Sequence, residues 1–520
     1  MRNPHLVLLS TLLVITLGTS AQLYEVPLDR KIQRSSLIVE GRVVEQHCFW
    51  NNKHTMIFTS NKIEVFKIFK GSMTATHIEV VTPGGVINDT AVQASELLSL
   101  TNGEIGVFFC YPNLLNLRSP QTHTILYDIW ASAQGCFKYD NEGRKASAPF
   151  VKYESVENGL YPELQFKTGR AYTDIKPSFS VAQLRPTEGP QQRPQATVTS
   201  FSPASVVAGA ISDAAQNVLT INGTGFGTAT GVARVEFDDP DNGSGGAATS
   251  GSTIFAAPGH ASNTSDYVIS WSPTQIVLRV PAKVGTGFFT VYDDAGSPGI
   301  SPTALDVKYA NLTFGAFGSS PRYKMITLGN RNTTGGYTYF YSNVNGAGAT
   351  DFALSTSEPA FARAMATWRE LYGVNFVFGG AIANQVVNAN NVNDNTIMLD
   401  NTNTGTGPLA DGVLAVCWTS ANACVGSFNA PRLGFDIVIR NPGVSIDASG
   451  DFGFNDGPCR TATGGPPFII DMETVCLHEI GHAINLGHIN DGLQSNNPSK
   501  VMHFAVTNGR DRRTPDWSAA

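Results

Sequence analysis

Three histidines and one glutamate lie close together near the end of the chain, in the segment HEIGHAINLGH. His478 and His482 are four residues apart, so on a helix their imidazoles project from one face at a separation that a single zinc ion can bridge. Glu479 directly follows the first histidine and can reach a water molecule beside the metal. His488 lies six residues beyond His482, so the chain must turn sharply to bring in a third imidazole. This arrangement predicts Zn2+ held by three histidines, with Glu479 as the general base.

The alternative interpretation is that these histidines are ordinary core or surface side chains. Only ten histidines occur in the chain, and three of them have ligand spacing beside a suitable glutamate, which favours the metal site. Asp471 and Glu473 precede the first histidine and suit the start of a helix, where acidic side chains cap the backbone and complement the helix dipole. We therefore expect the histidine pair to lie on a helix.

The segment resembles the pattern HExxHxxGxxH, followed by a methionine turn, of the metzincin zinc metallopeptidases. The three histidines and Glu479 match this pattern, and Asn485 stands at the glycine position that ends the helix. Asparagine is the non-glycine residue that most readily adopts the left-handed conformation, so the turn should still form. Met502, in VMHF, is similar to the methionine of the turn, although a lone methionine more often only fills a core.

The resemblance identifies the clan but not the subfamily. VMHF is similar to the MHY of astacins, but Phe504 stands where their tyrosine adds to the zinc sphere. Ile489, after the third histidine, matches neither the astacin nor the matrixin residue. DGVLAVCW resembles the matrixin edge strand above the cleft. The resemblance therefore implies that the substrate extends along Gly412, Val413, Leu414 and Ala415.

The resemblance implies a secreted endopeptidase that hydrolyses peptide bonds of extracellular proteins. Zinc would activate a water molecule, and Glu479 would move its proton. A second hypothesis, from another class, is a surface adhesin or polymer-binding protein whose peptidase domain is latent or secondary, since the predicted β-domains make up more than half of the chain. Zinc content and protein cleavage by the wild type and by Glu479→Ala would separate the two.

The elements that position these residues are predicted to belong to the last unit of a multidomain chain of 520 residues. Short β-branched runs indicate an N-terminal all-β domain that looks like OB-like domains, and the segment LTINGTGFG with its neighbours resembles an IPT/TIG immunoglobulin-like sandwich. The remainder is predicted to be an α+β metzincin-like domain. The predicted segments are a signal peptide (1–21), the N-terminal β-domain (22–185), a linker (186–195), the Ig-like domain (196–310) and the zinc peptidase domain (311–520).

The first residues indicate export from the cell. Arg2, an apolar stretch and small residues up to Ala21 are typical of a secretory signal peptide, and a short membrane anchor is the less favoured alternative. No later segment is apolar for long enough to cross a bilayer. The net charge of -7 and the lack of a basic stripe argue against nucleic acid as a partner. The expected partners are a protein or peptide substrate and a cell-surface or matrix component bound by the β-domains. The chain ends soon after Met502, where a metzincin domain normally continues, which indicates C-terminal truncation.

Seven cysteines in an exported chain allow disulfides but leave one cysteine over. Spacing does not determine connectivity, and the most local choice leaves Cys48 unpaired. That choice pairs Cys417 with Cys424, Cys459 with Cys476, and Cys110 with Cys136.

Three aspartates offer a second, weaker metal hypothesis. Asp238, Asp239 and Asp241 could hold Ca2+, but they lack the spacing of an EF-hand loop. A solvated loop is the favoured interpretation for them.

Overall fold

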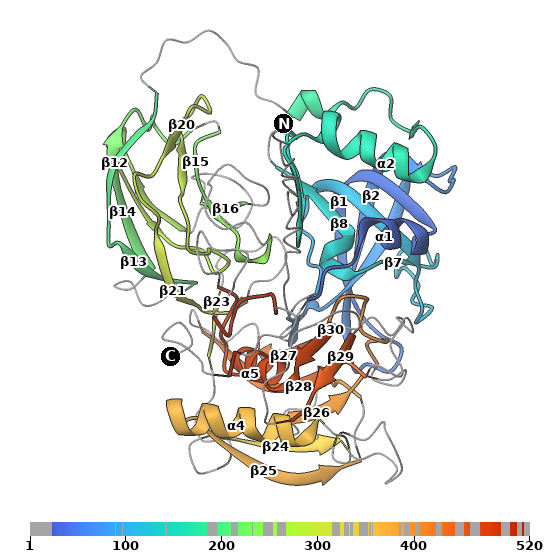
Figure 1. Ribbon diagram of the computed structural model, residues 1–520. Coiled ribbons are helices and arrows are strands. Elements are labelled where there is room, and N and C mark those ends of the chain that lie inside the picture. Colours follow the sequence, from blue (N-terminus) through green and yellow to red (C-terminus); the bar gives the residue numbers. More distant parts are fainter. Residues whose placement is uncertain are drawn as a thin grey trace, which may run out of the picture.

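The computed structural model shows a chain built mainly of β-sheets (Figure 1). It describes residues 23–88, 90–95, 97–140, 143–184, 195–209, 217–230, 232–242, 253–256, 267–314, 323–326, 332, 336–342, 352, 355, 357–383, 386–388, 395–400, 405–422, 429–441, 452–457, 468–489, 500–506 and 512–513. The predicted signal peptide, nearly all of the predicted linker, Cys424 and Cys459 lie outside these residues.

The N-terminal part forms a closed β-sheet. Its long strands β1 (Leu37–Trp50) and β2 (Ile57–Lys70) are rich in β-branched and aromatic residues, which favour extended structure. β1 pairs with both β2 and β6, so the strands β1, β2, β3, β7 and β6 close into a barrel. The remaining elements are α1 (Leu28–Arg34), β3 (His77–Pro83), β6 (Ile105–Pro112), β7 (Tyr127–Ile129), η1 (Ser132–Gly135), β8 (Cys136–Tyr139), β9 (Ala146–Ala148), β10 (Val151–Tyr153), η2 (Val156–Leu160), α2 (Tyr161–Thr168), β11 (Thr173–Asp174) and η3 (Val181–Leu184).

The middle part consists of short strands in two four-stranded sheets and one two-stranded sheet. The first sheet has the order β12-β14-β18-β17, the second β16-β15-β19-β20, and β13 pairs in parallel with β21. The elements are β12 (Thr197–Ser202), β13 (Ser205–Ala208), β14 (Val218–Thr224), β15 (Arg234–Asp238), η4 (Pro240–Asn242), β16 (Thr253–Ala256), β17 (Val268–Trp271), β18 (Gln275–Arg279), β19 (Thr290–Tyr292), β20 (Pro298–Ile300) and β21 (Asp306–Ala310).

The C-terminal part contains a sheet with the strand order β25-β24-β26-β28-β27-β5-β4. Its last two strands, β4 (Gly85–Ile87) and β5 (Thr90–Ala94), come from the N-terminal part of the chain. The other elements are β22 (Thr313–Phe314), β23 (Tyr323–Ile326), β24 (Gly336–Ser342), α4 (Glu358–Tyr372), β25 (Asn375–Ile382), β26 (Asn395–Leu399), β27 (Ala415–Asn422), β28 (Asn429–Ile439), β29 (Phe452–Asn455), β30 (Phe468–Asp471) and α5 (Met472–Ala483).

The two C-terminal helices pack against each other and fix the position of α5. Phe361, Met365 and Trp368 recur at helical spacing and are buried on one face of α4. The Trp368 indole N–H donates to the Leu477 carbonyl on α5 at 2.9 Å. Arg363 of α4 forms an ion pair of 2.7 Å with Glu473 in the first turn of α5. The site helix is therefore held by both apolar packing and polar contacts.

The predicted fold class is wrong. It divided the chain into an all-β domain, an Ig-like sandwich and an independent α+β metzincin-like domain. The described structure is mostly β, with 45% strand and 17% helix, a five-stranded barrel and only four α-helices. The C-terminal sheet is also extended by β5 and β4, so its strands do not all come from residues 311–520. Local periodicity indicates individual helices and strands, but it does not show which distant strands pair, and this is why the prediction failed.

The cysteines also differ from the prediction. Cys110 and Cys136 are buried free thiols on neighbouring strands, and the register places Cys136 opposite Phe108 instead of Cys110. Cys417 and Cys476 are buried, and their predicted partners Cys424 and Cys459 lie outside the described residues; Cys48 is a free thiol. Burial raises the pKa of the Cys136 thiol to about 12, so it behaves as a neutral core side chain.

Among the described residues, no helix combines the length and the apolar character needed to cross a bilayer.

Candidate metal centre

Helix α5 carries the first two histidines and Glu479 through the interior of the protein. Asp471 is its N-cap, and the Asp471 carboxylate accepts a hydrogen bond of 3.0 Å from the Thr474 backbone N–H. Every residue of the helix is buried. His478, Glu479 and His482 are each at most 2% exposed.

The helix ends in a turn that redirects the chain toward the third histidine. Asn485 has a φ of 72°, in the left-handed region. The Leu486 N–H donates to the Gly481 carbonyl at 3.0 Å, and the Asn485 N–H donates to the His482 carbonyl at 2.9 Å. These two bonds form a Schellman motif with asparagine at the left-handed position. A residue outside the helix also stabilises the turn: the Leu312 N–H donates to the Asn485 carbonyl at 3.0 Å.

The turn brings three imidazoles together. The ring centroids of His478 and His482 are 4.5 Å apart, and the His488 ring lies 5.2 Å and 4.9 Å from them. One nitrogen from each ring lies within 4.8 Å of the others. Three imidazoles are the protein ligands of many catalytic zinc sites, in which the fourth position stays open for water.

The contacts of the first two histidines show that this set fits a metal ion. His478 Nδ1 lies 2.7 Å from the Val501 carbonyl oxygen, and His482 Nδ1 lies 2.8 Å from that of Leu486. A carbonyl only accepts, so each Nδ1 carries a proton, and Nε2 is the nitrogen left to bind a metal. The two Nε2 atoms face each other at 2.9 Å inside the core. Two imidazole nitrogens this close together can bind the same ion.

The third histidine has a carboxylate partner from a distant part of the chain. His488 Nδ1 lies 2.6 Å from Asp241 Oδ1, in the short helical turn η4. A carboxylate on the second nitrogen of a ligating histidine fixes the tautomer and orients the ring. All three imidazoles thus have Nδ1 engaged, and one nitrogen of each ring lies within 4.8 Å of the others.

The same contact corrects the interpretation of the aspartates. Asp238 and Asp239 are buried, at 4% and 6% exposure, and do not lie in a solvated loop. Asp241 faces His488 and also lies 3.7 Å from the Lys283 ammonium. In the described part of the chain, the group of side chains with metal-ligand geometry is the histidine cluster, and Ca2+ has no support.

Met502 lies beneath the histidine helix. It is 1% exposed, and a Cβ placed at Gly481 would overlap its sulfur, so the thioether packs directly against the helix between His478 and His482. The Ile489 N–H donates to the Met502 carbonyl at 3.1 Å, which joins this turn to the segment carrying His488. Phe504 is buried against Phe150, with ring centroids 5.6 Å apart, and takes no part in the metal site.

Glu479 has a hydroxyl partner that its sequence position did not predict. The Ser95 hydroxyl donates to Glu479 Oε2 at 3.2 Å. The same hydroxyl accepts a hydrogen bond of 2.8 Å from the Cys417 N–H on β27. A residue of the N-terminal part therefore joins the predicted general base to the predicted substrate strand.

The predicted edge strand begins later than expected and is not an edge. β27 starts at Ala415, and Gly412 lies before it in a left-handed conformation with a φ of 82°. Val413 and Leu414 are fully buried. β5 pairs with β27 on the side opposite β28 from Trp418 to Asn422, beyond Gly412–Ala415, whose substrate-binding role stays a prediction.

Sequence reasoning missed three residues that shape the site, namely Ser95, Asp241 as a histidine partner, and Gly481. Of these three, only Gly481 could have been found from the local sequence. A glycine inside a helix lowers its stability, and such a glycine often marks a place where another part of the chain packs closely. Ser95 and Asp241 reach the site through tertiary structure, and nothing in their own sequence neighbourhoods points to it.

Comparisons with protein families and with curated proteins found no similar protein. No protein-family model matches the chain, and no curated protein is significantly similar to it. The chemistry of the site is thus the basis for any statement about what the protein does.

Proposed function

We propose that the protein is a zinc-dependent endopeptidase that is exported and hydrolyses peptide bonds of extracellular proteins. The observation that carries this proposal is the convergence of three imidazoles, with one nitrogen of each ring within 4.8 Å of the others, two of them on the same helix as Glu479. The proposal agrees with the resemblance of HEIGHAINLGH to the metzincin pattern.

His478, His482 and His488 would hold the ion. When bound, zinc would polarise the scissile carbonyl and make the attacking water more acidic. Glu479 would accept the proton of that water and deliver it to the leaving amine. The burial of Glu479 keeps bulk water from competing for its carboxylate. β5 already pairs with β27 from Trp418 to Asn422, so an extended substrate would pair with the chain before Trp418.

The Glu479→Ala variant tests the assigned chemistry. We expect turnover of an unstructured protein substrate to fall by at least about a hundredfold, the usual effect of losing a general base. Bound zinc, measured by metal analysis, should stay at the wild-type level because Glu479 is not a ligand. Glu45→Ala, which changes an exposed glutamate of the N-terminal sheet, serves as the control and should alter neither quantity. Loss of zinc from Glu479→Ala, or unchanged turnover, contradicts the role of general base.

A further inference from the structure

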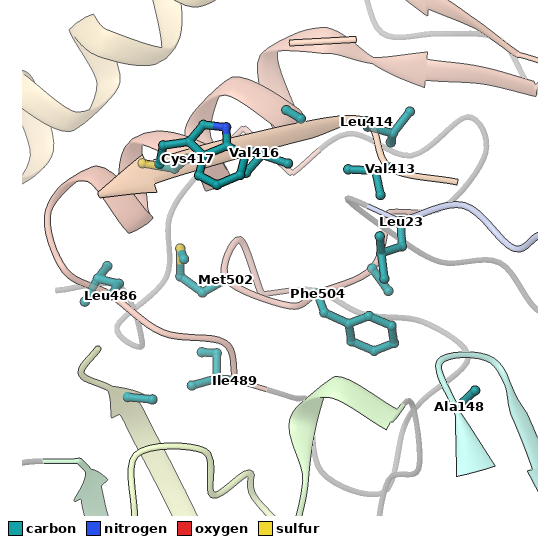
Figure 2. Packing of buried hydrophobic residues seen from close by; sticks show 14 of the residues in the cluster. Leu23, Ala148, Val413, Leu414, Val416, Cys417, Leu486, Ile489, Met502 and Phe504 are labelled. Carbon is teal, nitrogen blue, oxygen red and sulfur yellow. The ribbon is translucent and has the colours of Figure 1, made fainter. Parts of the chain in front are cut away.

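Ser95 joins two parts of the site that lie far apart in the sequence. It follows β5, whose residues Thr90–Ala94 pair antiparallel with β27. The Ser95 backbone N–H donates to the Cys417 carbonyl at 3.1 Å, which continues this pairing by one residue. β27 carries Cys417 above Met502 (Figure 2) and contacts the histidine helix α5. The strand pairing therefore fixes the Ser95 backbone against the strand that packs on α5.

The two hydrogen bonds of the Ser95 hydroxyl determine where its proton points. The Cys417 N–H can only donate, so at 2.8 Å it uses the Ser95 hydroxyl oxygen as its acceptor. The hydroxyl then donates its own proton to Glu479 Oε2, at 3.2 Å. A serine hydroxyl carries a single proton, so the backbone of β27 directs that proton to the carboxylate.

This contact restrains a torsion of Glu479 that the helix does not set. The terminal torsion of a glutamate side chain is broad and roughly two-fold, so the position of Glu479 on α5 leaves the plane of its carboxylate weakly determined. A hydrogen bond to Oε2 restrains that plane and thereby the positions of both carboxylate oxygens. Proton transfer from water requires the accepting oxygen within hydrogen-bond reach, and a misplacement of about 1 Å can lower the rate about a hundredfold.

We infer that Ser95 is a positioning residue that holds the Glu479 carboxylate in the orientation needed for proton transfer. This inference rests on the proposed function. Ser95 acts through Glu479 and exchanges no proton with the substrate. The reaction centre is therefore completed by a residue from the N-terminal part of the chain, and the active form of the protein keeps that residue bound.

Two substitutions of Ser95 in the whole, zinc-loaded chain test this role. Ser95→Ala removes the hydroxyl, and we expect kcat for a fluorogenic peptide to fall about tenfold, the effect of losing one hydrogen bond to a charged group. KM should not change, because the hydroxyl acts on the base and not on the bound peptide. Ser95→Thr keeps a hydroxyl and should restore most of kcat. Bound zinc, measured by metal analysis, should stay at the wild-type level in both variants.

Two control variants separate the hydroxyl from the strand that carries it. Val92→Ala shortens a buried side chain of β5 and leaves the Ser95 hydroxyl in place, so it should lower stability in urea unfolding without changing kcat. Ser60→Ala removes a hydroxyl that donates to Glu79 at 2.7 Å within the N-terminal sheet. It should change neither kcat nor KM.

Three results contradict the positioning role and leave the proposed peptidase standing. A kcat in Ser95→Ala equal to or above that of the wild type would show that the hydroxyl does not assist the base. An equal fall of kcat in Val92→Ala would assign the effect to the strand. Native mass spectrometry of the assayed protein shows whether the segment with Ser95 is still bound, and activity confined to protein that has lost it is the third.

Failure of the proposed function gives a different result. Zinc-loaded protein that is inert in the wild type and in every variant would overturn the peptidase and, with it, the role of Ser95. A lower kcat in Ser95→Ala alone, with rescue in Ser95→Thr and unchanged zinc, supports both.

Discussion

At the scale of single residues, the conformation of Asn485 decides whether the third histidine reaches the proposed metal site. Asn485 occupies the left-handed position of the helix-ending turn. Asn485→Gly should retain zinc as well as the wild type, because glycine adopts this conformation without steric cost. Asn485→Val should strain the turn by about 1–3 kcal/mol, the usual cost of a forced backbone conformation. Zinc retention against a chelator series measures both variants, and a Val variant as tight as the wild type would contradict the account.

The carboxylate on His488 gives a second prediction at this scale. Asp241→Ala should lower zinc affinity by about 10- to 100-fold, the range for losing such a partner of a metal-ligating histidine. The zinc affinity of Asp241→Asn should lie between those of the wild type and Asp241→Ala, because the amide oxygen still accepts a hydrogen bond from Nδ1 but carries no charge. Competition with a chromogenic chelator gives the affinities. Asp306→Ala, at a carboxylate that accepts from Ser205 in the same part of the chain, is the control. An unchanged affinity in Asp241→Ala would show that the contact does not orient the ligand.

At the scale of elements, the close approach of α5 to the turn carrying Met502 depends on one glycine. Gly481→Ala puts a Cβ into the Met502 sulfur, and overpacking of this kind costs about 1–3 kcal/mol. Zinc affinity should fall together with stability in urea unfolding, and Met502→Ala in the same chain should restore part of both. The matched control is Gly487→Ala, whose Cβ would meet Ala310 at an ordinary 3.4 Å. If the double variant shows no recovery, the sulfur is not what excludes the methyl group.

The helices and strands also show which parts of the fold and of the candidate site can be predicted from the sequence. The histidine pair, the N-cap at Asp471 and the turn at Asn485 follow from residues close together in the chain, whose geometry is set by the helix itself. The pairing of β5 with β27 does not, because TAVQA carries no mark of its distant partner. The independent α+β domain was predicted for the same reason, since strand pairing over long separations is decided by the whole fold.

At the scale of the whole molecule, buried carboxyl groups make stability depend on pH. Burial raises the pKa of Asp400 to about 7, partly offset by the Leu409 N–H and by Arg440. Below about pH 7 the native state therefore holds a proton that the unfolded chain, with a pKa of about 3.9, releases above pH 4. The stabilisation by this group is complete below about pH 4 and is lost as the pH rises through 7.

Asp400→Asn tests this dependence, because its amide cannot titrate. Between about pH 4.5 and 6.5, the free energy of unfolding of the wild type relative to the variant should fall by about 1.4 kcal/mol per pH unit. Urea unfolding in the presence of a chelator measures it, so that protonation of the metal ligands does not contribute. A constant difference across this range would mean that Asp400 is already ionised in the native state.

The contacts around His488 link metal supply to the arrangement of the protein. Asp241 and the segment from Ala310 to Leu312 both belong to the middle part or its end, and both hold the stretch that carries the third ligand. If these contacts raise the affinity for zinc, then by thermodynamic reciprocity bound zinc stabilises the contacts by the same free energy. If the cluster binds zinc as proposed, the metal-free chain would have weaker contacts between its middle and C-terminal parts. Under zinc-poor conditions the metal-free form would then be cleaved by proteases sooner than the zinc-bound form.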